Sequence, residues 1–309
     1  GPWVTPEQAS KRHVYAQLTL KGPLHYTGTL PLPDVDGRFY RDVAVQAFPA
    51  STGSIQEGDV ALLDTKCARD SLPGPGTPIQ AICEAPLQPL SFVPGTPVLR
   101  PADCVDLTAQ CSKTGKLVWD VPEGDWVVLR TGCTLTGKST SWSSPTGIGL
   151  EIDPFDAQAM DFHFLQTAAV LAEDAGPLTG KTFTSVQIDS WETGCPNWTM
   201  GLLEAFHQRR GYDARPYLPV LAGYFVGGSE ISDRFLYDYR KTLGDLIAAN
   251  TFGRLSERAE ATGLVQQSEA GGVCCPRWPA MDALQGRAGR SCPDNPPTGV
   301  YMSSSRIIG

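Results

Sequence analysis

Between residues 150 and 270, strand-like segments alternate with helical ones, and this alternation constrains the fold more than any other feature of the sequence. Three short apolar segments read as strands: residues 183–189, 217–225 and 264–269. Apolar residues spaced three or four apart, with capping residues around them, mark three helices: residues 156–176, 200–210 and 232–263. Strands joined through helices pair in parallel, with the helices outside. We therefore expect an α/β fold in this half of the chain.

The first half of the chain reads as β-structure. Alternating apolar and polar residues predict strands over residues 14–20, 26–32 and 40–48. Residues 116–130 predict a hairpin, with Trp119 and Trp126 on either side of a four-residue turn at Pro122–Asp125. We expect residues from about 40 to 137 to form an antiparallel sandwich. Taken alone, this region is typical of a structural β-domain that carries no chemistry.

The 309-residue chain is acidic, with a formal net charge of −8 and a pI of about 5.0. This charge argues against nucleic acid or an anionic membrane surface as the main partner. No apolar run approaches the roughly 20 residues of a membrane-spanning helix, and no glycine-rich phosphate loop indicates a nucleotide enzyme. The chain begins without Met and without the regions of a signal peptide, which indicates a mature product or a fragment.

The nine cysteines favour an oxidising compartment. No CxxC pair occurs and only four His are present, so a zinc site is not expected, and disulfides in a secreted protein are the better interpretation. Cys104 and Cys111 are close enough in sequence to bridge across a turn. Asn197-Trp198-Thr199 is a glycosylation sequon, which agrees with secretion. We therefore expect a secreted or extracytoplasmic protein.

The candidate site follows the strand at residues 183–189. Carboxylates, indoles and an amide gather at or after its end: Asp189, Trp191, Glu192, Asn197 and Trp198. Parallel α/β barrels build active sites at the C-terminal ends of their strands, and sugar chemistry combines aromatic faces with carboxylates. Glu269 ends the strand at residues 264–269, so two carboxylates are expected at one edge of the sheet, as glycoside hydrolysis requires. The alternative is an acidic, aromatic loop without function, with Glu269 as a polar residue before a turn.

Several separated segments of the sequence, taken together, resemble one family. They are GPWVTPEQASK, FYRDVAVQAFP, WDVPEGDWVVLRTGCTLTG, GIGLEIDPFDAQAMDFHF, IDSWETGCPNWT, RRGYDARPYLPVLAG, DRFLYDYRKTLGDLIAANTFGRL and SEAGG. They are similar to segments of glycoside hydrolase family 106, the α-L-rhamnosidases, over most of residues 1–290 except residues 50–100. The resemblance implies a (β/α)8 catalytic barrel interrupted by β-rich insertions, inverting hydrolysis of terminal α-L-rhamnosides in a rhamnose-containing glycan, and a calcium ion near the sugar.

The resemblance also assigns roles to single residues. Glu192 matches the general acid of the family, and Glu269 matches a second acidic residue. Four residues of the same stretch are expected to bind substrate: Asp189, Trp191, Asn197 and Trp198. The sequence does not indicate which residues would ligate the calcium ion.

Two departures from the family favour an alternative. The family's first barrel strands precede its GGPW segment and are absent here, and Val300 stands where the family has a Glu that is a candidate general base. Because a Val side chain cannot accept a proton, the alternative is a non-catalytic carbohydrate-binding relative or an inactive fragment. The expected architecture is a partial (β/α)8-type barrel with an inserted antiparallel β-rich domain. Its parts are a barrel-derived segment with linking strands (residues 1–39), a sandwich-like insertion (40–149) and the barrel portion with the catalytic-type residues (150–309).

Overall fold

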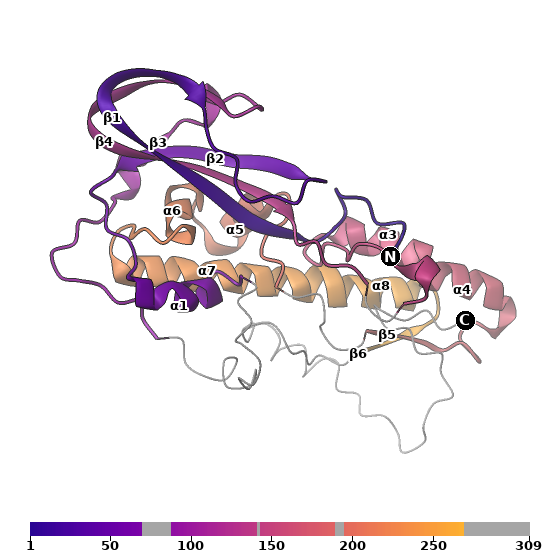
Figure 1. The fold of residues 1–309 in the computed structure, drawn as a ribbon. Coiled ribbons are helices and arrows are strands. Elements are labelled where there is room, and N and C mark those ends of the chain that lie inside the picture. Colours follow the sequence, from indigo (N-terminus) through magenta and orange to yellow (C-terminus); the bar gives the residue numbers. More distant parts are fainter. Residues whose placement is uncertain (70–87, 141–142, 189–194, 269–309) are drawn as a thin grey trace.

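The computed structural model describes residues 1–69, 88–140, 143–188 and 195–268. A curved antiparallel sheet lies against a layer of helices, and a second, two-stranded sheet lies near the far end of that layer (Figure 1). The long helix α7 (Ser229–Ile247) runs along the helical layer. The predicted α/β class is confirmed.

The larger sheet contains four antiparallel strands in the order β1-β4-β2-β3. They are β1 (Lys11–Thr29), β2 (Tyr40–Pro49), β3 (Val105–Asp106) and β4 (Lys116–Leu135). β4 lies between β1 and β2, and it pairs with β1 along its whole length. The strands predicted at residues 14–20 and 26–32 therefore belong to one long strand, β1, which ends at Thr29.

The hairpin predicted at residues 116–130 is wrong. β4 continues through Pro122–Asp125, because β1 supplies cross-strand pairing on both sides of that stretch, and the turn-forming residues bend the ladder instead. Trp119 and Trp126 therefore belong to the same strand. Their rings still meet edge to face, with centroids 5.5 Å apart, because the ladder of β1 and β4 curls back over itself (Figure 1).

This curl takes the place of the second layer of the predicted sandwich. Among the described residues, the antiparallel strands form one four-stranded sheet rather than two sheets packed face to face. Apolar side chains make a separate core in this region: Leu20, Leu30, Val45, Ala47, Leu107, Leu117, Val121 and Val128. The bent ladder therefore buries apolar side chains that a flat sheet would leave in water.

Gly22 lies at the bend, opposite Gly124. A Cβ atom on Gly22 would lie 1.8 Å from the carbonyl oxygen of Pro122, a backbone atom that cannot rotate away. We expect Gly22→Ala to lower the free energy of unfolding by about 1–3 kcal/mol, measured by urea denaturation. Gly37→Ala is the control, because nothing lies within 4 Å of its added Cβ. Equal stability of the two variants would show that the bend relaxes freely.

The helices carry most of the second half of the chain. They are α1 (Val60–Lys66), α3 (Ala157–Gln166), α4 (Ala168–Ala175), α5 (Leu202–Arg210), α6 (Leu218–Leu221), α7 and α8 (Arg254–Ala261). A π-helical stretch, Ala248–Gly253, joins α7 to α8, so the predicted helix at residues 232–263 is confirmed with an earlier start. It ends before Gly263, whose φ of +79° suits glycine. In the described part of the chain, no helix has the length and apolar character needed to cross a membrane.

Two other predicted elements differ from the structure. The helix at residues 156–176 begins as predicted, with the Asp156 carboxylate accepting a hydrogen bond from the Gln158 N–H at 2.8 Å, but divides into α3 and α4 at Thr167. The backbone of Thr167 leaves helical geometry, with φ −128° and ψ −91°. Residues 217–225 contain helix α6 rather than a strand, because a short apolar run also suits a buried helical turn and Pro219 lacks a ladder donor.

The second sheet confirms the central prediction from the sequence. β5 (Ser185–Ile188) and β6 (Val265–Ser268) pair in parallel, with Ile188 opposite Ser268. Helices α3, α4 and α8 pack on it through an apolar core that includes Phe164, Val186 and Leu255. The C-terminal ends of the two strands therefore lie at the same edge.

A larger core joins the four-stranded sheet to α5, α6 and α7. Its members include Phe48 and Leu129 of the sheet and Phe206, Phe235 and Leu243 of the helices, each at most 1% exposed. The sheet and the helical layer therefore hold each other in place, and they fix the segments that line the cavity described below.

The predicted bridge between Cys104 and Cys111 is wrong, since both are free thiols. Gln46 Nε2 donates a hydrogen bond to the Cys104 sulfur at 3.3 Å, whereas the Cys111 thiol donates to the carbonyl oxygen of Ser112 at 3.6 Å. The two sulfurs thus have different partners. Burial raises the pKa of Cys104 to about 12 and keeps this thiol protonated.

Candidate functional site

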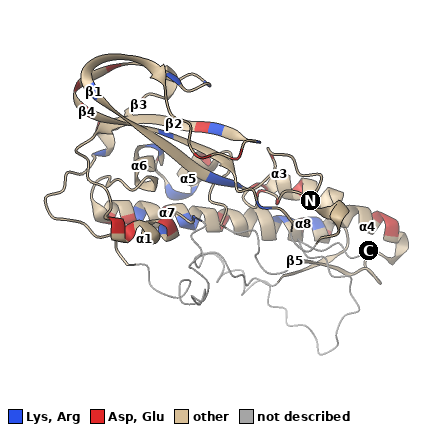
Figure 2. Cartoon of the chain, viewed as in Figure 1, with Lys and Arg blue, Asp and Glu red and all other residues tan. Residues whose placement is uncertain are grey.

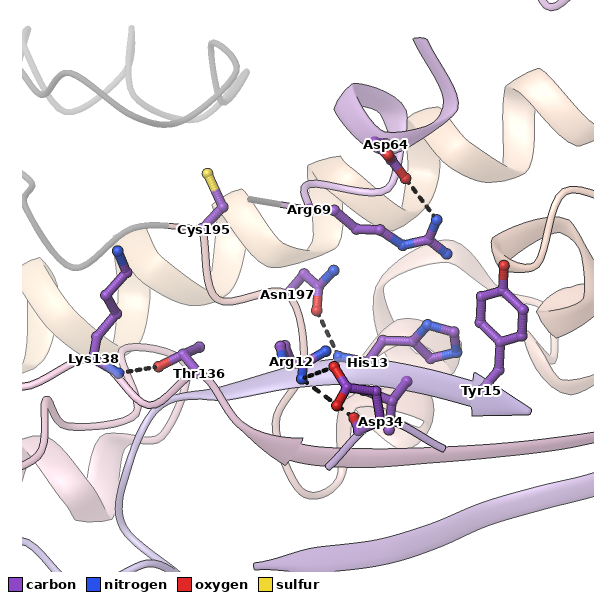
Figure 3. Close-up of a pocket in the computed structure, with 11 residues that line it drawn as sticks. Arg12, His13, Tyr15, Asp34, Asp64, Arg69, Thr136, Lys138, Cys195 and Asn197 are labelled. Carbon is purple, nitrogen blue, oxygen red and sulfur yellow. Dashed lines mark hydrogen bonds and ion pairs between the residues drawn. The ribbon is translucent and has the colours of Figure 1, made fainter. Parts of the chain in front are cut away.

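A cavity of about 480 Å³ opens beside the start of β1 (Figure 3). It is lined by Arg12, His13, Val14, Tyr15, Asp34, Asp64, Arg69, Thr136, Lys138, Cys195 and Asn197. These residues come from β1, from the loop between β1 and β2, from α1 and the turn after it, from the loop after β4, and from the segment before α5. The volume lies in the range of small-molecule sites. Most lining side chains are polar, so the cavity suits a ligand that carries several hydrogen-bonding groups.

Four of the predicted site residues, Asp189, Trp191, Glu192 and Glu269, lie outside the described residues. The structure describes the strand ends that precede them: Ile188 and Ser268 are paired, and Glu192 and Glu269 follow by four positions and by one position in the sequence. The roles of these side chains stay predictions.

Asn197 lines the cavity and connects three segments of the chain. Its Oδ1 atom accepts a hydrogen bond from the backbone N–H of His13 at 2.7 Å, and its Nδ2 atom donates to the carbonyl oxygen of Cys67 at 3.0 Å. The side chain of Tyr239 donates to the Asn197 carbonyl oxygen. Asn197 is 1% exposed, so its amide is not accessible to a glycan-transferring enzyme in the folded protein, and its sugar-binding role stays a prediction.

Trp198 lies in the core beneath the cavity. It is 2% exposed, its backbone N–H donates to the Lys11 carbonyl oxygen at 3.3 Å, and its ring centroid lies 5.6 Å from that of His13. In this structure Trp198 supports the imidazole of His13, and any influence of the indole on a ligand in the cavity passes through that ring. Its predicted contact with substrate remains a prediction.

His13 is the functional candidate for which the sequence contains no signal. Its ring centroid lies 5.6 Å from that of Trp198 and 6.0 Å from that of Tyr15, and the residue is 5% exposed. Burial, helped by the charge of Arg69, lowers the pKa of His13 well below its ordinary value, so the imidazole is neutral at physiological pH. Its Nε2 atom is buried without a hydrogen-bond partner among the described residues.

The wall of the cavity carries three cationic side chains and two carboxylates. Arg12 pairs with Asp34 at 3.1 Å near the solvent, and Arg69 pairs with Asp64 at 2.8 Å. Arg69 also lies over the ring of Tyr15, 5.6 Å from its centroid. Lys138 is the third cation, and Figure 2 shows blue basic residues at the start of β1. On a chain with net charge −8, this wall is locally basic.

A buried ion pair holds the start of β1 in place. The Lys11 ammonium donates to Asp153 at 3.1 Å and to the carbonyl oxygens of Glu7 and Ala9 at 2.8 Å each. Thr199 Oγ1 donates to the same Asp153 carboxylate at 2.8 Å. Burial raises the pKa of Asp153, and Lys11 opposes this rise. The pair therefore anchors β1 to the segment that carries Asn197.

No metal site can be assigned from the described residues, which contain no group of three or more His, Cys, Asp or Glu placed to hold an ion. The oxygen-rich set that calcium needs would have to include other parts of the chain or backbone carbonyl groups.

The fold and the cavity define an α/β protein whose polar site suits a ligand rich in hydroxyl groups. The sequence profile of glycoside hydrolase family 106, described as alpha-L-rhamnosidase, matches residues 88–288. The chain therefore belongs to this family, and the resemblance stated above is confirmed.

Two known proteins extend this comparison. A curated protein of Formosa agariphila with the provisional name beta-glucuronidase is 36% identical over 287 residues, which are 92% of this chain and 23% of that protein. The solved structure titled "Structure of Rhamnosidase from Novosphingobium sp. PP1Y" matches with a TM-score of 0.67 and 24% identity, over 88% of this chain and 38% of that one. The structural match shows a shared fold. In both comparisons the chain spans well under half of the relative.

Proposed function

We propose that this chain belongs to a glycoside hydrolase that cleaves terminal α-L-rhamnosides with inversion of configuration, acting on a rhamnose-containing glycan. Membership of the rhamnosidase family over residues 88–288 carries the proposal. The parallel pairing of Ile188 with Ser268 supports it, because the segments that contain Glu192 and Glu269 continue from one edge of a sheet.

Inverting hydrolysis uses one protonated carboxyl group and one ionised carboxylate, roughly 6.5–9.5 Å apart. In the proposed mechanism Glu192 donates its proton to the leaving oxygen, and a low-dielectric surrounding with Asp189 nearby keeps it protonated beforehand. Glu269 activates or positions the attacking water, or holds the metal. Trp191 would stack on the apolar face of the sugar ring.

The proposal also includes a barrel architecture, a calcium ion and a location outside the cytoplasm. β5 and β6 would be two strands of a partial (β/α)8-type barrel, and the four-stranded sheet would be its insertion. A calcium ion bound by oxygen ligands would lie near the sugar and help to orient its hydroxyl groups. The protein would act outside the cytoplasm, where plant or microbial glycans are found.

A second candidate function is hydrolysis of β-glucuronides. The name of the Formosa agariphila relative suggests it, and the basic wall of the cavity favours it. A uronic acid carries a carboxylate that an Arg side chain such as that of Arg69 or Arg12 can bind with two parallel hydrogen bonds. A neutral rhamnose residue offers no such group.

One assay separates these functions. The purified chain is incubated with p-nitrophenyl α-L-rhamnoside and with p-nitrophenyl β-D-glucuronide, each with calcium and with a chelator. We expect nitrophenol release from the rhamnoside and a loss of this release in the chelator that calcium restores. Release from the glucuronide alone would replace the proposal by the second candidate.

The same samples address the non-catalytic alternative, which rests on Val300, a residue outside the described part of the chain. If neither substrate is cleaved but rhamnose binds in a calorimetric titration, a carbohydrate-binding role replaces hydrolysis. Circular dichroism of the same preparation shows whether an inactive sample is folded, so that an inactive but unfolded sample is not mistaken for a binding protein.

A further inference from the structure

We infer that the cavity beside the start of β1 binds an acidic group, a carboxylate or a sulfate ester, on the sugar unit next to the terminal rhamnose, and that Arg69 holds this group. The inference rests on the proposed function, because it takes the ligand to be a rhamnose-containing glycan. It narrows the substrate class to acidic glycans. It differs from the second candidate function, because the acidic sugar is not the one that is cleaved.

The first argument is the charge of the cavity wall. Its three cationic side chains outnumber its two carboxylates, although the whole chain carries a formal net charge of −8: they are Arg12, Arg69 and Lys138 against Asp34 and Asp64. The Asp34 side chain is 94% exposed, and an ion pair this open to water contributes little and yields readily to a competing anion. The wall therefore attracts an anionic ligand.

The second argument is the position of Arg69. Its guanidinium group donates to Asp64 at 2.8 Å and lies 5.6 Å from the ring centroid of Tyr15. Both neighbours line the cavity, and Figure 3 shows the guanidinium group between them. The Arg69 side chain is 21% exposed, so the group is held at the wall and is still open to a ligand. A group that is fixed before binding loses little entropy when the ligand arrives.

The third argument is the number of donors that Arg69 has left. A guanidinium group has five N–H donors and no acceptor. Among the described residues two of the five have acceptors, one from Nη1 to Asp64 and one from Nη2 to the carbonyl oxygen of Leu221. The other donors, including Nε–H, match a group that offers two or more negatively charged oxygens. Carboxylates and sulfate esters are the groups of this kind that sugars carry.

Two uncharged polar side chains of the cavity are already occupied. The Asn197 amide makes two hydrogen bonds within the protein, and Thr136 Oγ1 is bonded to Ser10 Oγ at 2.5 Å. The Tyr15 hydroxyl has no hydrogen-bond partner among the described residues, so it can donate to the same anion as Arg69. The donors that the wall presents to a ligand are therefore mainly cationic.

The cavity also lies close in the chain to the proposed general acid. Cys195 lines it, and Glu192 precedes Cys195 by three positions. Three residues of extended chain span at most about 11 Å. One oligosaccharide can therefore reach both the proposed acid and the cavity. Because rhamnose itself carries no acidic group, the anion that Arg69 binds belongs to the neighbouring unit.

The test compares sugars that differ in charge. D-glucuronate, D-glucose 6-sulfate and D-glucose are titrated calorimetrically into the full chain. We expect at least one acidic sugar to bind about tenfold or more tightly than glucose, and its affinity to fall as sodium chloride is added, because salt screens the attraction. Binding of only the glucuronate or only the sulfate identifies the acidic group. Equal binding of all three sugars, or no binding of either acidic sugar, would overturn the inference.

The variant Arg69→Gln is expected to weaken binding of the acidic sugar about tenfold or more, because hydrogen bonds to a charged group are lost. Arg234→Gln on α7 is the matched control, since it removes the same charge from an exposed side chain that does not line the cavity. Arg69→Lys keeps the charge without the planar fork and should give an intermediate affinity. Unchanged affinity in a folded Arg69→Gln would also count against the inference.

A change at Asp34 covers the case in which the Arg69 variants do not fold. Asp34→Asn alters an exposed side chain and removes a carboxylate that competes for the cations of the cavity. We expect the acidic sugar to bind a few times more tightly, a gain that a merely structural role would not produce. Asp120→Asn on β4 is its control, because Asp120 is also exposed and does not line the cavity. Equal gains in both variants would reduce the effect to overall charge and reject this site.

The outcomes separate this inference from the proposed function. Acidic sugars bound through Arg69, without hydrolysis of any rhamnoside, would reject the proposed function and keep the subsite. Hydrolysis of rhamnosides without binding of either acidic sugar would reject the subsite and keep the proposed function. Cleavage of p-nitrophenyl β-D-glucuronide would place the uronic acid at the cleaved bond, and would overturn the inference in favour of the second candidate function.

Discussion

Glu192→Gln is expected to lower the rate of hydrolysis of an alkyl α-L-rhamnoside by about 10²–10⁴-fold, the usual contribution of general acid catalysis. An alkoxide is a poor leaving group, so its oxygen must receive a proton as the glycosidic bond breaks. The glutamine side chain keeps the size of the carboxyl group and cannot supply that proton. Steady-state kinetics with methyl α-L-rhamnoside and with p-nitrophenyl α-L-rhamnoside measure the effect.

The comparison of the two substrates identifies the role of Glu192. Nitrophenolate leaves as a stable anion, so the variant should retain much more activity on the aryl substrate. Glu269→Gln is expected to lower both rates alike, because its proposed role lies with the water or the metal. Glu204→Gln on α5 is the control, since Glu204 is exposed and, among the described residues, its side chain accepts a hydrogen bond only from Gln208, at 2.8 Å. Equal losses on both substrates in Glu192→Gln would argue against the acid assignment.

The interpretation of these variants depends on whether the wild-type protein hydrolyses the substrates. If it binds rhamnose and does not hydrolyse it, Val300→Glu tests whether the family's glutamate has been lost at that position. Recovered hydrolysis would identify position 300 as the site of the base. No recovery in a folded protein would argue that hydrolysis needs more than one carboxylate at position 300.

Local signals in the sequence are sufficient to predict many of the secondary structure elements. The cap at Asp156, the glycines Gly211 and Gly263 that follow α5 and α8, and the apolar residues of β5 and β6 all act within a few residues of the chain. The parallel pairing followed from the helices between the two strands. These predictions hold because short-range geometry decides them.

The features that the sequence does not reveal depend on contacts between residues far apart in the chain. The Pro122–Asp125 stretch has the residues of a turn, yet β1 pairs across it and keeps it in the ladder. His13 and Asn197 are 184 positions apart, and only the folded chain brings them together. Trp198 is expected from the sequence to bind substrate, and in the fold its indole is 2% exposed and lies beside His13, so its contact with substrate stays a prediction. An aromatic residue looks the same in a sequence whether it faces a ligand or the core.

Asp153→Ala is expected to lower the free energy of unfolding by about 3–5 kcal/mol, because it leaves a buried charge without its partner. The Lys11 side chain is 1% exposed, and Asp153 is its only carboxylate partner among the described residues. The substitution also removes the acceptor of Thr199 Oγ1 and of the Phe155 N–H. Urea denaturation at neutral pH measures the loss.

Two further variants separate charge from packing. Asp213→Ala removes an exposed pair, in which the side chains of Arg215 and Asp213 are 55% and 50% exposed, and should change stability by less than about 1 kcal/mol. Lys11→Met combined with Asp153→Leu removes both buried charges and should be more stable than Asp153→Ala. A loss below about 1 kcal/mol in Asp153→Ala would mean that water reaches the Lys11 ammonium.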